Sequence, residues 1–116
     1  MIGVFDSGLG GLSVLAAIAR ALPRADLAYV ADTAHVPYGN KPDGFIRGRV
    51  VTIGEHLVGQ GCGMLVVACN TATAAAAEAI RAAMDLPIVA LEPGVKPAVA
   101  LSKSGVIGVL ATTRTL

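Results

Sequence analysis

The sequence contains few aromatic residues and few charged ones. Among its 116 residues the aromatic share is 3%, with no tryptophan, so a core must be built mainly from alanine, valine, leucine and isoleucine. Charged residues make up 15% and nearly cancel to a net charge of +1, which argues against a nucleic-acid or anionic-membrane binder that works by bulk charge. Because 54% of the residues are hydrophobic, the composition also excludes an intrinsically disordered chain.

Long apolar runs and metal-binding cysteine patterns are missing as well. The longest apolar stretches, 64–68 and 106–111, are strand-sized and far below the ~20 residues that a membrane span needs. The two cysteines, Cys62 and Cys69, fit neither a CxxC motif nor the spacing of zinc ligands. With two free thiols and no basic leader segment, we expect a cytoplasmic protein that holds no metal.

Short apolar runs alternate with helical patterns along the chain. Strands are predicted over residues 1–5, 28–31, 64–68, 87–91 and 106–111, and helices over 11–22, 44–58, 71–84 and 95–101. This alternation predicts the α/β fold class, with a Rossmann-like parallel sheet between two helical layers. Residues 1–104 are expected to form a partial α/β domain, incomplete at its C-terminal side. No helix follows the strand predicted over 106–111, so either the chain is a fragment or this strand pairs with something that is absent.

The helix predicted over 44–58 has an apolar stripe but two weak points. The stripe consists of Ile46, Val50, Ile53 and Leu57. Gly48 and Gly54 interrupt the same segment, and glycine lowers helix propensity. The alanine-rich segment over 71–84 carries no such interruption and is the stronger helix.

Polar and nucleophilic side chains follow the first four predicted strands. They are Asp6-Ser7, Asp32-Thr33, Cys69-Asn70-Thr71 and Glu92, in strand order. Ligands of open α/β sheets bind beyond the carboxyl ends of the strands, where these residues are expected to meet. His35, in the loop after the second strand, is expected at the surface.

Cys69 is the most informative of these residues. It lies between a buried strand and the start of a helix, where unpaired amides and the helix dipole favour a thiolate. The alternative is a buried structural cysteine. Cys62 precedes the same strand, so it falls at the opposite edge of the sheet and is expected to be structural.

The first loop supports two further interpretations. Asp6-Ser7 can be an ordinary helix cap, or its carboxylate can hold an ammonium group while the glycine turn holds an anion. Gly8-Leu9-Gly10, with Asp32 after the next strand, also resembles part of a dinucleotide-binding fingerprint. Ser13 stands where the third glycine belongs, and Asp6 would repel a pyrophosphate. A nucleotide- or dinucleotide-binding module therefore stays as the alternative.

Taken together, the strand-end motifs resemble the glutamate racemase family. The matching segments are residues 6–11 (DSGLGG), 31–39 (ADTAHVPYG), 69–73 (CNTAT), 92–98 (EPGVKPA) and 105–112 (GVIGVLAT). The resemblance implies interconversion of L- and D-glutamate for peptidoglycan, without pyridoxal phosphate or metal. An aspartate racemase is a related alternative, but the opening Asp-Ser-Gly-x-Gly-Gly favours glutamate.

The resemblance also implies roles for individual residues. Cys69 would be one of two thiols that work on opposite faces of the α-carbon. Asp6 and Ser7 would contact the amino end of the substrate and assist that thiol. Asn70 and Thr71 would bind the α-carboxylate, and Tyr38 and Gly39 the side-chain carboxylate.

One family feature has no counterpart in these 116 residues. The family's second thiol belongs to a Cys-Thr-His segment of a second domain, which this sequence lacks. The resemblance implies that residues 105–116 supply the first strand of that domain. We therefore expect the chain alone to be inactive as a racemase, and a non-catalytic fragment stays as a further alternative. An uncovered sheet face is expected to promote self-association, so a homo-oligomer stays open.

Overall fold

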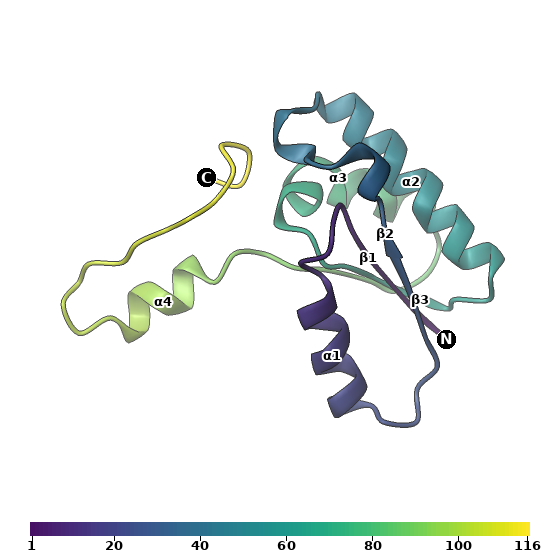
Figure 1. The fold of residues 1–116 in the computed structure, drawn as a ribbon, viewed down its shortest axis with the longest axis horizontal. Helices are drawn as coiled ribbons and strands as arrows, with labels where there is room; N and C mark the ends of the chain where they lie inside the picture. Colours follow the sequence, from purple (N-terminus) through teal and green to yellow (C-terminus); the bar gives the residue numbers. More distant parts are fainter.

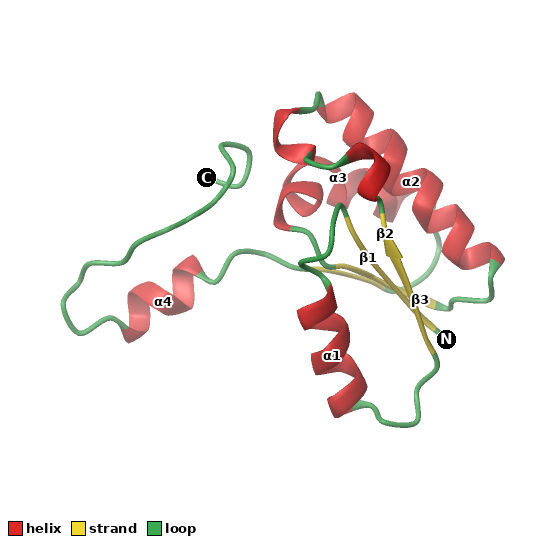
Figure 2. Ribbon diagram, in the orientation of Figure 1, coloured by secondary structure: helices red, strands yellow, loops and turns green.

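The computed structural model describes all 116 residues and contains eight of the nine strands and helices that the sequence predicts, at closely similar ranges. In chain order the elements are β1 (Ile2–Asp6), α1 (Leu12–Ala21), β2 (Leu27–Ala31), two 3₁₀ turns (Thr33–His35 and Tyr38–Asn40), α2 (Asp43–Gly59), β3 (Met64–Val67), α3 (Asn70–Ala83), β4 (Ile88–Ala90) and α4 (Val95–Leu101). Figure 1 and Figure 2 show how they are arranged. No helix combines the length and hydropathy that crossing a bilayer requires.

The strands form one parallel sheet in the order β2-β1-β3-β4. Phe5 of β1 lies opposite Val30 on one side and Val67 on the other, so β1 and β3 occupy the centre. The predicted α/β class is confirmed. Because all strands run the same way, their carboxyl ends meet at a single edge, which brings the loops after β1, β2 and β3 together.

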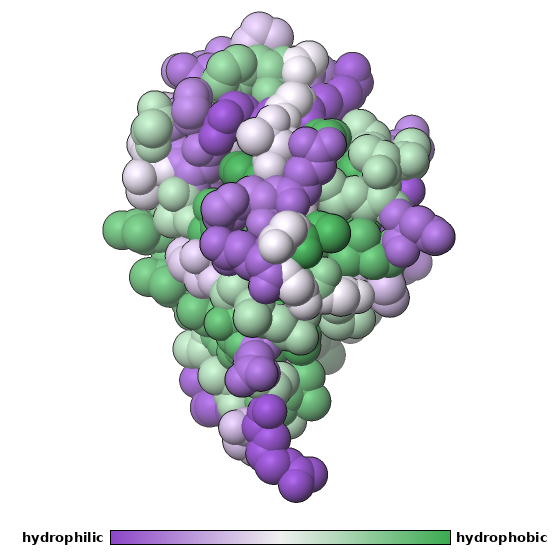
Figure 3. Space-filling view, turned by 90° about the vertical axis from the view of Figure 1, so that its right-hand side faces the viewer, coloured by the Kyte–Doolittle hydropathy of each residue, from purple (hydrophilic) through white to green (hydrophobic).

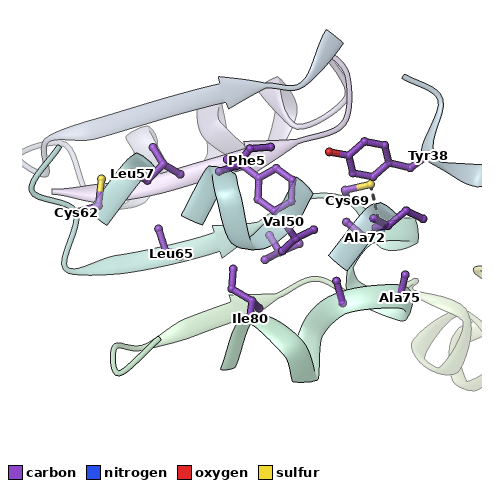
Figure 4. Close-up of a cluster of buried hydrophobic side chains, with 14 residues drawn as sticks. Phe5, Tyr38, Val50, Leu57, Cys62, Leu65, Cys69, Ala72, Ala75 and Ile80 are labelled. Atoms are coloured by element: carbon purple, nitrogen blue, oxygen red, sulfur yellow. Dashed lines mark hydrogen bonds between the residues drawn. The ribbon is translucent and has the colours of Figure 1, made fainter. Parts of the chain in front are cut away.

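Helices α2 and α3 cover one face of the sheet and enclose the core. Alternate strand residues Phe5, Leu65 and Val67 point into this layer. The predicted stripe of α2, consisting of Ile46, Val50, Ile53 and Leu57, is buried against them. Figure 4 shows this cluster between the sheet and the two helices.

The opposite face is covered only in part, by α1. No residue of α1 is buried, and Leu12 and Leu22 at its ends are both exposed. Between α1 and the strands lies a groove of about 250 Å³ whose lining is entirely hydrophobic, and Val89 of β4 beside it is 47% exposed. Apolar side chains also reach the surface over the lower half of the view in Figure 3.

The strand expected over 106–111 is not formed. After α4 the chain runs without regular structure and turns back toward the body of the molecule, as Figure 1 shows. A strand exists only where a neighbour completes its hydrogen-bond ladder, and no other strand lies beside this segment. Its end is held elsewhere: Arg114 donates to the carbonyl of Lys41 at 2.6 Å and contacts the Asp43 carboxylate.

Candidate active site

A cavity of about 540 Å³ lies at the carboxyl edge of β1 and β3. The strand-end residues Asp6, Cys69, Asn70, Thr71 and Glu92 line it, as the sequence predicts, whereas the other predicted residues, Ser7, Asp32 and Thr33, do not. The C-terminal segment forms another part of the wall with residues 109–112 and 115. A pocket bounded by a thiol, carboxylates, hydroxyls and a helix N-terminus is suited to a small polar ligand.

Cys69 caps the N-terminus of α3. It follows β3 in an extended conformation, and its sulfur accepts a hydrogen bond from the Ala72 amide at 3.4 Å. The Ser7 hydroxyl oxygen lies 3.5 Å from the same sulfur, and either group can donate. The side chain is buried, yet it borders the cavity. A negative charge on this sulfur would therefore face the helix dipole and a hydroxyl group.

The loop after β1 wraps around the carboxylate of Asp6. One carboxylate oxygen accepts the Ser7 amide and the other accepts the Gly11 amide, both at 2.7 Å. Asp6 is thereby held beside Ser7 and Cys69 with only 6% of its surface exposed. A side chain at position 11 would collide with Asp6, since an added Cβ would lie 2.7 Å from the Asp6 Cβ. Two amides of this loop are thus engaged by Asp6, which weakens the case for a pyrophosphate site here.

Tyr29 of β2 supports the same loop and was missed in the sequence analysis. Its hydroxyl donates to the Gly8 carbonyl at 3.1 Å. Burial, with the negative charge of Asp6 adding to it, raises the pKa of Tyr29. The sequence offers one indication of this role, because Tyr29 is one of only two tyrosines and lies in a predicted strand. In the sheet it lies opposite Val4 of the central strand.

The loop after β2 is organised around Asp32. The Asp32 carboxylate accepts two hydrogen bonds from Arg49, both at 2.9 Å, and one from the Tyr38 hydroxyl at 2.5 Å. His35, expected at the surface, is partly exposed but places its Nδ1 3.0 Å from the same carboxylate. The family resemblance assigned no role to Arg49, and only the fold brings it to Asp32.

These contacts shift the pKa values of Asp32, Tyr38 and Arg49. Burial raises the pKa of Asp32, but hydrogen bonds from Arg49, Tyr38 and His35 outweigh it and lower the pKa to about 2. Burial, together with the hydrogen bond to Asp32, raises the pKa of Tyr38 far above its ordinary value. The hydrogen bond to Asp32 also raises the pKa of Arg49. Asp32 is therefore an anion, and Tyr38 a neutral phenol, throughout the physiological range.

Tyr38 and Gly39, which the resemblance assigns to the side-chain carboxylate, do not line the cavity. Tyr38 is 1% exposed, and its ring lies in the same buried cluster as Cys69 and Ala72, as Figure 4 shows. Its hydroxyl donates to Asp32 and is therefore not free to bind a ligand. Gly39 lies against the cavity-lining Thr112, whose Cγ2 would be 2.9 Å from an added Cβ.

Three threonines join the C-terminal segment to the start of α3. The hydroxyl oxygens of Thr71 and Thr112 are 3.0 Å apart, as are those of Thr112 and Thr115. Thr112 and Thr115 both line the cavity. The sequence analysis missed them because it assigned residues 105–116 to another domain.

Cys62 lies at the other end of β3, as predicted (Figure 4). It is buried near Leu57 and Gly3, away from the cavity. The chain's two thiols are thus separated by the length of a strand and cannot both reach one ligand. No group of three or more His, Cys, Asp or Glu side chains could hold a metal ion.

Comparison with known proteins gives a consistent result. No protein-family model matches the chain. Glutamate racemases from Ectopseudomonas mendocina and Ralstonia nicotianae are 61% and 59% identical over 99% of this chain, which spans 44% and 42% of their lengths. The structure of Escherichia coli glutamate racemase with L-glutamate and the activator UDP-MurNAc-Ala matches 98% of this chain and 43% of its own, with 42% identity and a TM-score of 0.93.

Other solved structures agree. Glutamate racemase from Aquifex pyrophilus matches 88% of this chain and 41% of its own with a TM-score of 0.81 at 42% identity. The Francisella tularensis enzyme, solved with D-glutamate, matches 77% of this chain and 34% of its own with a TM-score of 0.72 at 34% identity. The chain is therefore similar to glutamate racemases over 98–99% of its length, and it spans less than half of theirs.

Proposed function

We propose that this chain supplies one half of the active site of a glutamate racemase. The observation that carries the proposal is the position of Cys69. Its thiol lies at the N-terminus of α3 beside Ser7 and faces a cavity lined by Asp6 and Thr71. The relatives that match the chain are glutamate racemases, and solved members were obtained with L- or D-glutamate.

The chemistry required is the removal of a weakly acidic α-proton. In the proposed step the Cys69 thiolate forms an S–H bond, and the electron pair of the broken C–H bond stays on the α-carbon and its carboxylate. Asn70 and the Thr71 hydroxyl, at the helix N-terminus, are suited to stabilise that carboxylate. Asp6 and Ser7 would hold the ammonium end and assist the thiol.

Inversion needs a second proton donor on the opposite face of the carbanion. Cys62 is excluded from this role by its position at the far end of β3. The donor would come from outside these 116 residues, and the relatives are more than twice as long as the chain. Residues 105–116 would then lead into the domain that carries it. The chain alone is expected to exchange the α-proton but not to racemise.

The role in the cell follows from the product. D-Glutamate is a building block of peptidoglycan, so the whole enzyme would serve cell-wall synthesis and cell shape. The proposed substrate is a free amino acid, and the proposed location of the activity is the cytoplasm. The proposed partner is therefore this small molecule, with neither nucleic acid nor a membrane required.

The test is α-proton exchange in deuterium oxide, followed by NMR with L- and D-glutamate separately. Deprotonation by Cys69, exchange of the thiol proton with solvent and return of deuterium to the same face would replace the α-hydrogen without inverting the carbon. We expect such exchange with one enantiomer. It should be abolished in Cys69→Ala and retained in Cys62→Ala, which removes the chain's other buried thiol.

Two outcomes would contradict the proposal. Exchange that survives Cys69→Ala would remove the thiol from the mechanism. Racemisation by the 116-residue chain at the rate of an ordinary enzyme would show that no second half is needed. Saturable binding of NAD or another nucleotide, lost on bulky replacement of Gly10, would favour the alternative of a nucleotide-binding module.

A further inference from the structure

The buried carboxylate of Asp32 joins three separate parts of the fold. Asp32 directly follows β2, Arg49 belongs to α2, and Tyr38 begins the second 3₁₀ turn. Arg49 and Tyr38 both donate to this carboxylate, at 2.9 Å and 2.5 Å. Between β2 and α2 the only regular structure consists of two three-residue turns. The carboxylate therefore fixes the position of this loop relative to the sheet and the helix.

The turn that Asp32 holds packs behind two residues that line the candidate site, Cys69 and Thr112. The Tyr38 ring packs in the cluster that contains Cys69 (Figure 4). Gly39 lies against Thr112, which lines the cavity. A shift of this turn would therefore move both the surroundings of the thiol and the opening of the cavity.

Arg49 is the cation that makes this arrangement stable. Asp32 is only 6% exposed, and a buried carboxylate needs a charged partner with matching geometry. The guanidinium of Arg49 supplies two parallel N–H groups, one to each carboxylate oxygen. A lysine at this position would keep the charge but lose the two-pronged contact.

We infer that Arg49 is a positioning residue. Through its paired hydrogen bonds to Asp32 it holds the Tyr38–Gly39 turn against Thr112 of the cavity lining, and it thereby sets the affinity for the side-chain carboxylate of an acidic amino acid. The part concerning affinity rests on the proposed function, whereas the part concerning the turn does not.

The first experiment measures amide hydrogen exchange by NMR and needs no substrate. The Lys41 amide, bonded to the Tyr38 carbonyl at 3.0 Å, reports on the turn, and the Leu65 amide, bonded to the Pro87 carbonyl, reports on the sheet. In Arg49→Met we expect Lys41 to exchange about tenfold faster with Leu65 unchanged, and in Arg49→Lys an intermediate effect. Equal acceleration at both amides, or none at Lys41, would overturn the positioning role.

A matched control is available on the same helix. Arg47 is two residues away and 52% exposed, and its salt bridge to Asp43 is a surface contact at 3.7 Å. Arg47→Met should leave the exchange of the Lys41 amide unchanged. If it accelerated Lys41 as much as Arg49→Met does, the effect would belong to the charge of α2 rather than to the Asp32 contact.

The second experiment compares the binding of glutamate and alanine by NMR titration. Alanine shares the ammonium and α-carboxylate groups but lacks the side-chain carboxylate. Arg49→Met should weaken glutamate binding about tenfold relative to alanine, with partial rescue in Arg49→Lys. An equal loss for both ligands, or no loss, would overturn the affinity claim. Failure of the unchanged chain to bind glutamate would overturn both the proposed function and the affinity claim. The amide-exchange experiment would still test, independently, whether Arg49 holds the Tyr38–Gly39 turn in place.

Discussion

The Ser7 hydroxyl oxygen lies 3.5 Å from the Cys69 sulfur, although the two residues are 62 positions apart in the chain. The contact exists because β1 and β3 are adjacent and parallel, so that their carboxyl ends coincide. Ser7 also lies within reach of Asp6, whose carboxylate accepts its amide. A hydroxyl is thereby held between a carboxylate and the thiol.

Loss of this hydroxyl should make Cys69 less reactive. A thiolate that loses one hydrogen-bond donor is less stable, so Ser7→Ala should slow alkylation by iodoacetamide at neutral pH about threefold to tenfold. Ser7→Thr, which keeps the hydroxyl, should react close to the unchanged rate. The measurement uses a Cys62→Ala background, which leaves Cys69 as the single thiol. Equal rates in all three proteins would exclude the hydroxyl as a partner of the thiolate.

Substitution of Gly11 should damage the loop that holds Asp6. In Gly11→Ala the new methyl group would lie 2.7 Å from the Asp6 Cβ and 3.2 Å from the Ala68 Cβ, both beside rigid backbone. We expect a loss of about 1–3 kcal/mol in the free energy of unfolding. Gly10→Ala is the control, since its nearest neighbour would be at 3.4 Å. Urea denaturation compares the two, and similar values would show that the contact at Gly11 does not limit stability.

Stability should fall at both ends of the pH range because of Asp32 and Tyr38. Hydrogen bonding outweighs burial and lowers the pKa of Asp32 from its ordinary 3.8 to about 2 in the folded state. The network therefore stabilises the fold above about pH 4, and about 2 kcal/mol of that is lost as the pH falls toward 2. Burial raises the pKa of Tyr38, so its contribution is present below pH ~10 and is lost as the pH rises further.

Urea denaturation at a series of pH values measures this dependence. Asp32→Asn should flatten the acid limb between about pH 4 and 2, and Tyr38→Phe should flatten the alkaline limb. Asp85→Asn, at an exposed position, should leave the acid limb unchanged. An acid limb that keeps its slope in Asp32→Asn would assign the loss to other carboxylates.

The two glycines in the middle of α2 should respond in opposite directions to larger residues. Around Gly48 nothing lies within 4 Å of an added Cβ, so Gly48→Ala should stabilise the protein by about 0.5–1 kcal/mol. An added Cβ at Gly54 would lie 2.4 Å from Met84 Cε and 3.3 Å from Ile80 Cδ1. Gly54→Leu should therefore cost about 1–3 kcal/mol through overpacking. Thermal denaturation of the two variants measures these changes in stability. Stabilisation by both substitutions would contradict the close approach of α2 and α3 at Gly54.

The different packing of Gly48 and Gly54 could not be predicted from the sequence. Along the chain Gly48 and Gly54 have the same effect, since each lowers helix propensity. In the fold they differ, because the face of α2 that carries Gly54 packs against α3 and the one that carries Gly48 does not. A single sequence reveals how a residue suits its own helix, but not which neighbour that helix will meet.

The position of the C-terminal segment could not be predicted from the sequence either. The apolar run over 106–111 predicts a strand, yet a strand depends on a neighbour, and none is present beside this segment. Instead Thr112 and Thr115 meet Thr71 and close the cavity. Their contribution could not be predicted, since it depends on where the segment returns to the sheet edge.

The sequence by itself determined the α/β class, the order of strands and helices, and the placement of Asp6, Cys69, Asn70 and Thr71 at one edge of the sheet. These follow from local periodicity and from the rule that parallel strands end together. Only the tertiary structure decided that Arg49 pairs with Asp32 and that this pair holds Tyr38. Such contacts join residues far apart in the chain, and their energy depends on burial and geometry that no local pattern encodes.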